Sequence, residues 1–252
     1  MNNERHAAVR LTQAYDVIWR RLYRKLTTIN QQIEDARARG EAVNQAWLFR
    51  QERYGALPRQ VDREFRRFAE IATTSITRQQ SGAVNAAIGN SVELMNAAAE
   101  EASVTATFNR LPTAAVENLV GFLGNGSPLR SLIDRLPAHA RRVIEDGLIQ
   151  AVTLGISPRE TARRIREGLG GTLTRALTIA RTETARAYNT ATSQSYKQNS
   201  DIVDGWYWRS ARGRRSCAAC IALDGTFHSV NEPMKSHPNC RCVMIPAVEG
   251  VQ

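Results

Sequence analysis

Apolar residues recur every three or four positions over the first part of the chain. This spacing puts them on one face of a helix and predicts a single long helix from about Glu4 to Ala38. The pattern is a heptad repeat with one extra four-residue step between Leu22 and Leu26, a stutter that relaxes a supercoil locally. Gly40 is the expected stop. The expected apolar face consists of Leu11, Tyr15, Ile18, Leu22, Leu26, Ile29, Ile33 and Ala36.

Helical spacing continues beyond this first helix. A short helix is expected over residues 42–54, and the G-A-L-P stretch at residues 55–58 breaks the pattern. A second long amphipathic helix is expected over residues 59–103, with Gly82 and Gly89 as points where it could be interrupted. The two long helices are expected to form a hairpin or stalk. The apolar positions of the second helix are Val61, Phe65, Phe68, Ile71, Ile76, Val84, Ile88, Leu94 and Ala98.

A run of glycine, asparagine, serine and proline at residues 121–128 favours a domain boundary. We therefore expect a long-helix assembly region over residues 1–125 and a second domain over residues 126–252. The run is not a phosphate-binding loop, because no Gly-Lys-Ser/Thr ending follows it.

Helices of ordinary length are expected after this boundary. One covers residues 137–153. Ser157-Pro158-Arg159-Glu160 is a capping box with proline at the first helical position, and it predicts a helix to about Glu167. The glycines at 168, 170 and 171 are expected to end that helix, and a last long helix is expected over residues 172–199.

The pattern changes to alternation near the C-terminus. Residues 205–210 are rich in aromatic side chains and predict a strand, and residues 226–228 and 243–245 complete a small sheet. The expected fold is mainly α. Long N-terminal helices are followed by a helical C-terminal domain that ends in a small β zinc-knuckle-like module (α+β) over residues 206–247.

All four cysteines fall within this last module. Cys217 and Cys220 form a C-x-x-C pair, His237 with Cys240 repeats that spacing, and Cys242 is a fifth candidate. Two short pairs of thiol or imidazole ligands separated by a loop are typical of a tetrahedral zinc site. The sequence thus predicts a structural zinc ion, and which four of the five groups bind it stays open.

The sequence also allows other roles for the cysteines. The four thiols could form two disulfides, but no signal peptide or transmembrane run is recognisable, and disulfides are rare in the cytosol where we expect synthesis. A thioredoxin-like C-x-x-C needs a βαβ context, and a Cys–His nucleophile lacks a clear third group. A catalytic zinc keeps an open position, whereas ligands are here in surplus.

The charge balance adds a further hint. The chain has 34 Lys and Arg against 24 Asp and Glu, a formal net charge of +10 that favours a polyanionic neighbour, either nucleic acid or an acidic protein surface. Arg212 and Arg214, in a basic turn, are weak candidates for nucleic-acid contact. The cluster of Arg20, Arg21, Arg24 and Lys25 on the first helix is more simply a solvated face than a phosphate contact.

Several motifs in the last third of the chain agree in order with one known family. They are A-R-T-E at 180–183, Ala187 and Asn189, Trp208, Arg215, the C-x-x-C, L-D-G at 223–225 and H-P-N-C-R-C at 237–242. In this order and rough spacing the chain resembles the Mu protein F-like minor head proteins of tailed bacteriophages. Arg181, Glu183 and Arg215 are expected to form internal ion pairs that hold the knuckle against the last helix.

The resemblance implies a structural minor capsid protein that acts in head morphogenesis. Such a protein is made in the bacterial host cytoplasm and ends in the virion, inside the head or at the portal vertex. Its expected partners are the portal protein and the major capsid protein, with packaged double-stranded DNA as a further contact, and neither a membrane nor a small-molecule substrate is expected.

One departure from the family bears on catalysis. Members often carry an acidic residue a few positions after the tryptophan, where this chain has Gly213. We therefore predict no enzymatic activity. The alternative hypothesis is a zinc-stabilised basic DNA-binding protein.

Overall fold

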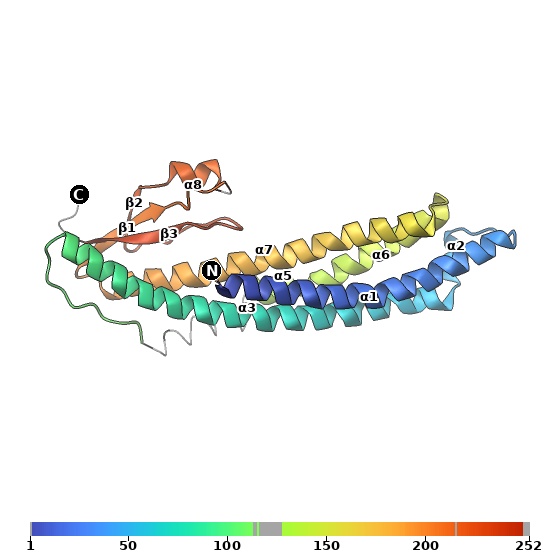
Figure 1. Cartoon of the computed structure of the whole chain (residues 1–252), viewed down its shortest axis with the longest axis horizontal. Helices are drawn as coiled ribbons and strands as arrows, with labels where there is room; N and C mark the ends of the chain where they lie inside the picture. Colours follow the sequence, from blue (N-terminus) through green and yellow to red (C-terminus); the bar gives the residue numbers. More distant parts are fainter. Residues whose placement is uncertain (1, 113–114, 116–127, 215, 249–252) are drawn as a thin grey trace. The chain divides into compact units, whose positions relative to one another are not determined.

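Long helices make up most of the chain (Figure 1), and the computed structural model describes residues 2–112, 115, 128–214 and 216–248. The helices are α1 (Asn2–Ala38), α2 (Gln45–Phe49), α3 (Glu52–Glu101), α5 (Pro128–Ile133), α6 (Leu136–Thr153), α7 (Pro158–Gln198) and α8 (Ala218–Ala222). The strands are β1 (Val203–Arg209), β2 (Phe227–Ser229) and β3 (Val243–Val248). The mainly α fold with a small C-terminal sheet is confirmed.

The chain forms two compact units, each built from two separate stretches. Unit 1 comprises Met1–Ser75 and Arg130–Leu177, and unit 2 comprises Ile76–Leu129 and Thr178–Gln252. Helices α3 and α7 therefore each contribute one part to each unit. The expected division at residues 125 and 126 stays a prediction, and the glycine-rich run that suggested it lies, apart from Pro128, outside the described residues.

Unit 1 is a helical core whose apolar stripe on α1 is the one predicted from the sequence. Its eight predicted positions are all buried, with Leu11, Leu22 and Leu26 completely inaccessible. Tyr15 meets Phe68 of α3 edge to face at a centroid distance of 6.3 Å. On α3 the core includes Ala72, which is buried, in place of the predicted Ile71, which is 40% exposed.

The helix ends of unit 1 follow local sequence signals. Gly40 adopts φ +75°, and the N–H of Glu41 donates to the carbonyl of Ala36 at 3.0 Å, which ends α1 as predicted. Ser157 caps α7, its Oγ accepting the N–H of Glu160 at 3.4 Å, and Pro158 opens the helix.

Six glycines and one proline expected to interrupt or end helices do not do so. Helix α3 runs through residues 55–58, Gly82 and Gly89 without a break, and α7 runs through Gly168, Gly170 and Gly171. Tyr54 and Leu57 are both buried at the start of α3, so packing there outweighs the local cost of Pro58. Tertiary contacts thus override a local helix-breaking tendency.

Two of the helical glycines allow α6 and α7 to approach closely. A Cβ at Gly147 would lie 2.5 Å from Ile165 Cγ1, and one at Gly168 would lie 2.6 Å from Val143 Cγ1. Both distances are far below van der Waals contact. Gly168 is therefore a packing residue between the helices, rather than the helix end that the sequence suggested.

Unit 2 contains the antiparallel sheet, in which β1 lies between β2 and β3. Trp206 of β1 pairs in register with His228 of β2 and with Pro246 of β3. Gly205 is required beside it, because a Cβ there would lie 2.2 Å from the His228 carbonyl oxygen. The register places Trp206 and Trp208 on the same face of the sheet.

This face packs into a core shared with the two long helices and the cysteines. Trp206, Trp208 and Met244 are buried together with Tyr196 of α7 and Met95 of α3. The Tyr196 hydroxyl donates to the Met244 carbonyl at 3.1 Å. Cys220, Cys240 and Cys242 complete the cluster, so the knuckle is part of the core of unit 2.

Candidate metal centre

The C-x-x-C pair is positioned by the start of helix α8. Cys217 is the N-cap residue, with extended backbone angles of φ −80° and ψ 161°, and Cys220 follows in the first turn. The N–H of Cys220 donates to Cys217 Sγ at 3.4 Å. A cap residue and the residue three positions later face the same side of a helix terminus, which brings both sulfurs to one point.

His237 reaches the same point from the loop before β3. Its Nε2 lies 3.3 Å from Cys217 Sγ and 3.1 Å from Cys220 Sγ. Its Nδ1 lies 2.8 Å from the carbonyl oxygen of Pro238, which can only accept a hydrogen bond. Nδ1 therefore carries the proton and Nε2 is the free lone pair, which is the arrangement of a metal-bound histidine.

Cys240 and Cys242 form the buried side of the cluster. Cys220 Sγ lies 3.8 Å from Cys240 Sγ, and the sulfurs of Cys220, Cys240 and Cys242 all lie within 4.8 Å of one another. The ligand atoms of Cys217, Cys220 and His237 meet the same limit. The five predicted groups thus form two sets of three that share Cys220, and each set could hold a metal ion.

The loop before β3, which carries His237, Cys240 and Cys242, is held against α7 by hydrogen bonds. Thr182 Oγ1 accepts the N–H of Asn239 at 3.1 Å, and the Asn189 side-chain amide donates to the Cys242 carbonyl at 3.4 Å. Asn239 adopts φ +63°, a left-handed conformation that asparagine tolerates. These contacts explain why Thr182 and Asn189 lie within or beside the motif on the last helix.

The thiols differ in their tendency to ionise. The backbone N–H of Cys220 is the main group that lowers the pKa of the Cys217 thiol, and His237 contributes further. Burial raises the pKa of the Cys220 and Cys240 thiols. Because a buried thiolate needs a compensating cation, the inner half of the cluster is suited to ions that bind sulfur tightly.

The donor set fits zinc. All four cysteines are free thiols, and with one imidazole they supply soft and borderline ligands rather than the oxygens that Mg²⁺ and Ca²⁺ prefer. The hollow between the ligands is about 10 Å³, too small for a substrate beside an ion. A closed structural site is consistent with this size.

The charged residues predicted to support the knuckle have mixed environments. Glu183 is 1% exposed, and its Oε1 lies 3.1 Å from Arg186 Nη1, a partner that the sequence did not single out. Burial raises the pKa of Glu183, and Arg186 only partly offsets it. The side chain of Arg181 is half-buried and engaged in contacts, while Arg215 lies outside the described residues.

Asp224 organises the basic turn, a role that the sequence did not reveal. Its carboxylate accepts the N–H of Ser210 at 2.8 Å and pairs with Arg212. The Ser210 N–H is the main cause of a lowered pKa for Asp224, with Arg212 adding to it. Arg212 is therefore partly neutralised, whereas Arg214 is exposed.

His228 is not among the residues of the cysteine cluster. Its ring stacks on Trp206 at a centroid distance of 4.3 Å and an interplanar angle of 16°. Its Nε2 is 3.0 Å from Thr226 Oγ1 and its Nδ1 is 3.1 Å from Glu232 Oε1. The side chain is 16% exposed, so it is a partly buried sheet residue with both nitrogens engaged.

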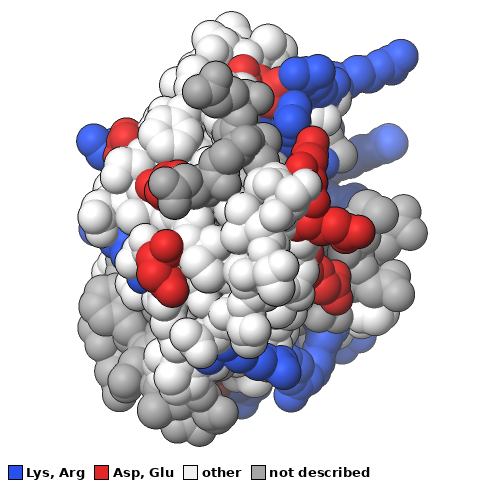
Figure 2. Space-filling model, turned by 90° about the vertical axis from the view of Figure 1, so that its left-hand side faces the viewer, with Lys and Arg blue, Asp and Glu red and all other residues white. Residues whose placement is uncertain are grey.

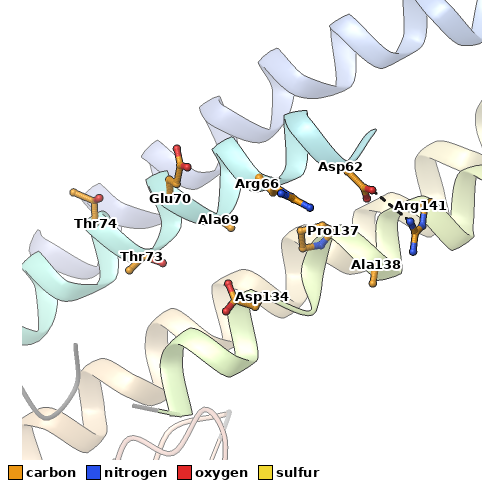
Figure 3. Close-up of a pocket in the computed structure, with 10 residues that line it drawn as sticks. All are labelled: Asp62, Arg66, Ala69, Glu70, Thr73, Thr74, Asp134, Pro137, Ala138 and Arg141. Atoms are coloured by element: carbon orange, nitrogen blue, oxygen red, sulfur yellow. Dashed lines mark hydrogen bonds and ion pairs between the residues drawn. The ribbon is translucent and has the colours of Figure 1, made fainter. Parts of the chain in front are cut away.

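A wide groove lies in unit 1, away from the cysteine cluster in sequence. It measures about 690 Å³, and its lining residues come from α3 and from residues 134–141 at and just before the start of α6 (Figure 3). Both signs of charge line it, and Asp62 pairs with Arg141 at 3.4 Å. Its charges are thus partly compensated.

Residues 142–245 match the family described as Phage Mu protein F like protein. This stretch contains the A-R-T-E motif and all five candidate metal ligands, so the resemblance drawn from the sequence is confirmed there. The family is one of phage head-morphogenesis proteins, which are structural. The comparisons with curated proteins and with solved structures gave no match. None of the helices described is long and apolar enough to span a membrane.

Proposed function

We propose that the chain is a minor capsid protein of a tailed bacteriophage, located in the head interior or at the portal vertex. The observation that carries this proposal is the family match over residues 142–245, a stretch that contains all the buried residues of the core around the cysteines except Met95. The portal protein and the major capsid protein are its partners during procapsid assembly. Long helices support this role, because they offer extended faces for docking on other helical proteins.

Quantitative mass spectrometry of purified procapsids and mature particles tests this role. A few to some tens of copies per particle, with cross-links to the portal protein, would support it. Absence from both kinds of particle would refute it. Presence in procapsids alone would identify an assembly factor that leaves during maturation, and would remove the proposed place in the finished virion.

We also propose that zinc holds the C-terminal module together through Cys217, Cys220, His237 and Cys240, with Cys242 as the substitute ligand. The first three have their ligand atoms within 4.8 Å of one another, and Cys240 is the buried thiol 3.8 Å from Cys220. The loop between β2 and β3 contains little regular structure, so an ion that joins it to α8 would contribute directly to folding.

Metal analysis of the reduced, purified chain tests the zinc assignment. One equivalent of zinc is expected in the wild type, and Co²⁺ substitution should give the absorption of a tetrahedral thiolate site. Cys220→Ser should lose the metal, because Cys220 belongs to both sets of ligands. A metal-free wild type prepared without chelators, or full zinc content in Cys220→Ser, would remove the assignment.

The alternative function is DNA binding by the knuckle through Arg212 and Arg214. The exposure of Arg214 favours it, while the pairing of Arg212 with Asp224 weakens it. It predicts that Arg214→Gln lowers the affinity for duplex DNA and reduces the salt slope by about 1. An unchanged slope would leave the basic turn without this role.

A further inference from the structure

Positive charge on this protein occurs in separate clusters. On the face that Figure 2 shows, Lys and Arg side chains form groups that alternate with Asp and Glu groups and with uncharged surface. A net charge of +10 therefore does not describe a uniform basic coat, and each cluster has its own local balance. One cluster in unit 1 differs from the groove in Figure 3, because its cations line a hollow without a carboxylate among the described lining residues.

The hollow lies between α1 and the first turns of α3. It measures about 290 Å³, and its walls are Lys25, Thr28 and Ile29 from α1 with Arg53, Ala56, Leu57 and Gln60 from α3. Ile29 and Leu57 are buried and form an apolar floor. The space exceeds what one water molecule needs many times over, so it can accept an anion of several heavy atoms.

The charge at this hollow is uncompensated. Its lining contains two cations, Lys25 and Arg53, and no carboxylate among the described residues. Neither cation takes part in the ion pairs of the described chain, whereas Arg21, one turn earlier on α1, pairs with Glu64 at 3.0 Å. The larger groove in Figure 3 contrasts with it, because Asp62, Glu70 and Asp134 there accompany Arg66 and Arg141.

The flanking sequence of α1 extends the positive charge along the helix. Arg20, Arg24 and Lys25 fall within six consecutive positions, which span roughly 7.5 Å at 1.5 Å per residue, while Arg21 between them is paired with Glu64. Duplex DNA carries one negative charge per roughly 1.7 Å of its axis, or about four over the same length. Like charges four residues apart repel each other on a helix, and a polyanion relieves this repulsion.

We propose that this hollow binds a phosphate group, with Lys25 and Arg53 as its two cationic contacts and a nucleic-acid backbone as its source. The guanidinium of Arg53 can hold two phosphate oxygens through a fork of N–H donors, and Lys25 adds a point charge from the opposite helix. The site recognises backbone and not sequence. The site lies in unit 1, whereas the metal centre lies in unit 2. Phosphate binding at this site can therefore be tested independently of metal binding and of the proposed role in the phage head.

Fluorescence anisotropy with a labelled mixed-sequence duplex, titrated from 50 to 500 mM NaCl, tests the proposal. The Lys25→Gln/Arg53→Gln variant should show a log–log salt slope shallower by about 0.9, the value for one phosphate, and a loss of affinity of roughly tenfold or more at low salt. The charge-retaining Lys25→Arg/Arg53→Lys variant should keep most of the binding. Calorimetric titration with inorganic phosphate tests whether free phosphate is the source instead.

The matched control removes the same charge elsewhere in unit 1. Arg142 and Arg175 are exposed helical residues outside the hollow, and Arg142→Gln/Arg175→Gln also lowers the net charge by two. Its slope should stay near that of the wild type. Phosphate binding that only Lys25→Gln/Arg53→Gln abolishes, without DNA binding, would assign the hollow to free phosphate. Equal losses in both double variants, or no binding of either ligand, would overturn the proposal.

Discussion

Gly168 gives the sharpest test of the helix packing. If it were only a glycine inside a helix, Gly168→Ala would stabilise the fold by about 0.5–1 kcal/mol, because alanine loses less backbone entropy. In the structure the new Cβ would lie 2.6 Å from Val143 Cγ1. Valine is branched at Cβ and has essentially one rotamer in a helix, so it cannot swing away cheaply.

The two effects have opposite signs, and their magnitudes decide the outcome. Overpacking of this kind costs about 1–3 kcal/mol, which exceeds the gain in helix propensity. We therefore expect Gly168→Ala to destabilise unit 1 by about 1 kcal/mol, equivalent to a few degrees in melting temperature for a chain of this size. Gly171→Ala is the matched control, because a Cβ there meets nothing within 4 Å and the residue is in the same helix.

Urea unfolding followed by circular dichroism at 222 nm measures both variants. Gly171→Ala should raise the midpoint and Gly168→Ala should lower it. A Val143→Ala change in the Gly168→Ala background should recover part of the loss, as a double-mutant cycle with coupling of about 1 kcal/mol. If Gly168→Ala stabilises as much as Gly171→Ala does, the close approach of α6 and α7 is refuted.

Three further predictions concern unit 2. Cys220→Ser should abolish zinc binding and expose the C-terminal module to limited proteolysis, while Cys242→Ser should retain the metal; equal zinc contents in the two would contradict the shared-ligand geometry. Burial raises the pKa of Glu183, so the stability that this residue contributes to the folded state is lost as the pH rises from the ordinary carboxyl pKa through the raised pKa. Glu183→Gln should therefore become more stable relative to the wild type between pH 4 and pH 7. A difference in urea midpoints that stays constant with pH would contradict this. The pKa of Asp224 is lowered, so the stability that this residue contributes to the folded state is present above the ordinary carboxyl pKa and is lost as the pH falls through the lowered pKa. Asp224→Asn should therefore loosen the basic turn at pH 7 and leave the rate of proteolysis at acid pH unchanged. Hydrogen exchange of the Ser210 N–H, which donates to Asp224, measures this loosening.

The sequence by itself determined those features that depend on neighbours along the chain. The apolar stripe of α1, the stop at Gly40 and the cap at Ser157 are set by residues within one or two helical turns, and each lies where the pattern predicts. The same holds for the C-x-x-C pair, because one turn of α8 is enough to bring both sulfurs together.

Tertiary structure decided whether a local signal was obeyed. Whether a glycine ends a helix depends on what lies opposite it: Gly168 stays helical within α7 and packs against Val143, which is distant in sequence. Likewise, the burial of Glu183 at 1% exposure, the role of Asp224 and the sharing of Cys220 between two ligand sets follow from what packs against each residue and from distances across loops. Periodicity records which face of an element is apolar, whereas close approach and charge pairing depend on the elements that cover that face.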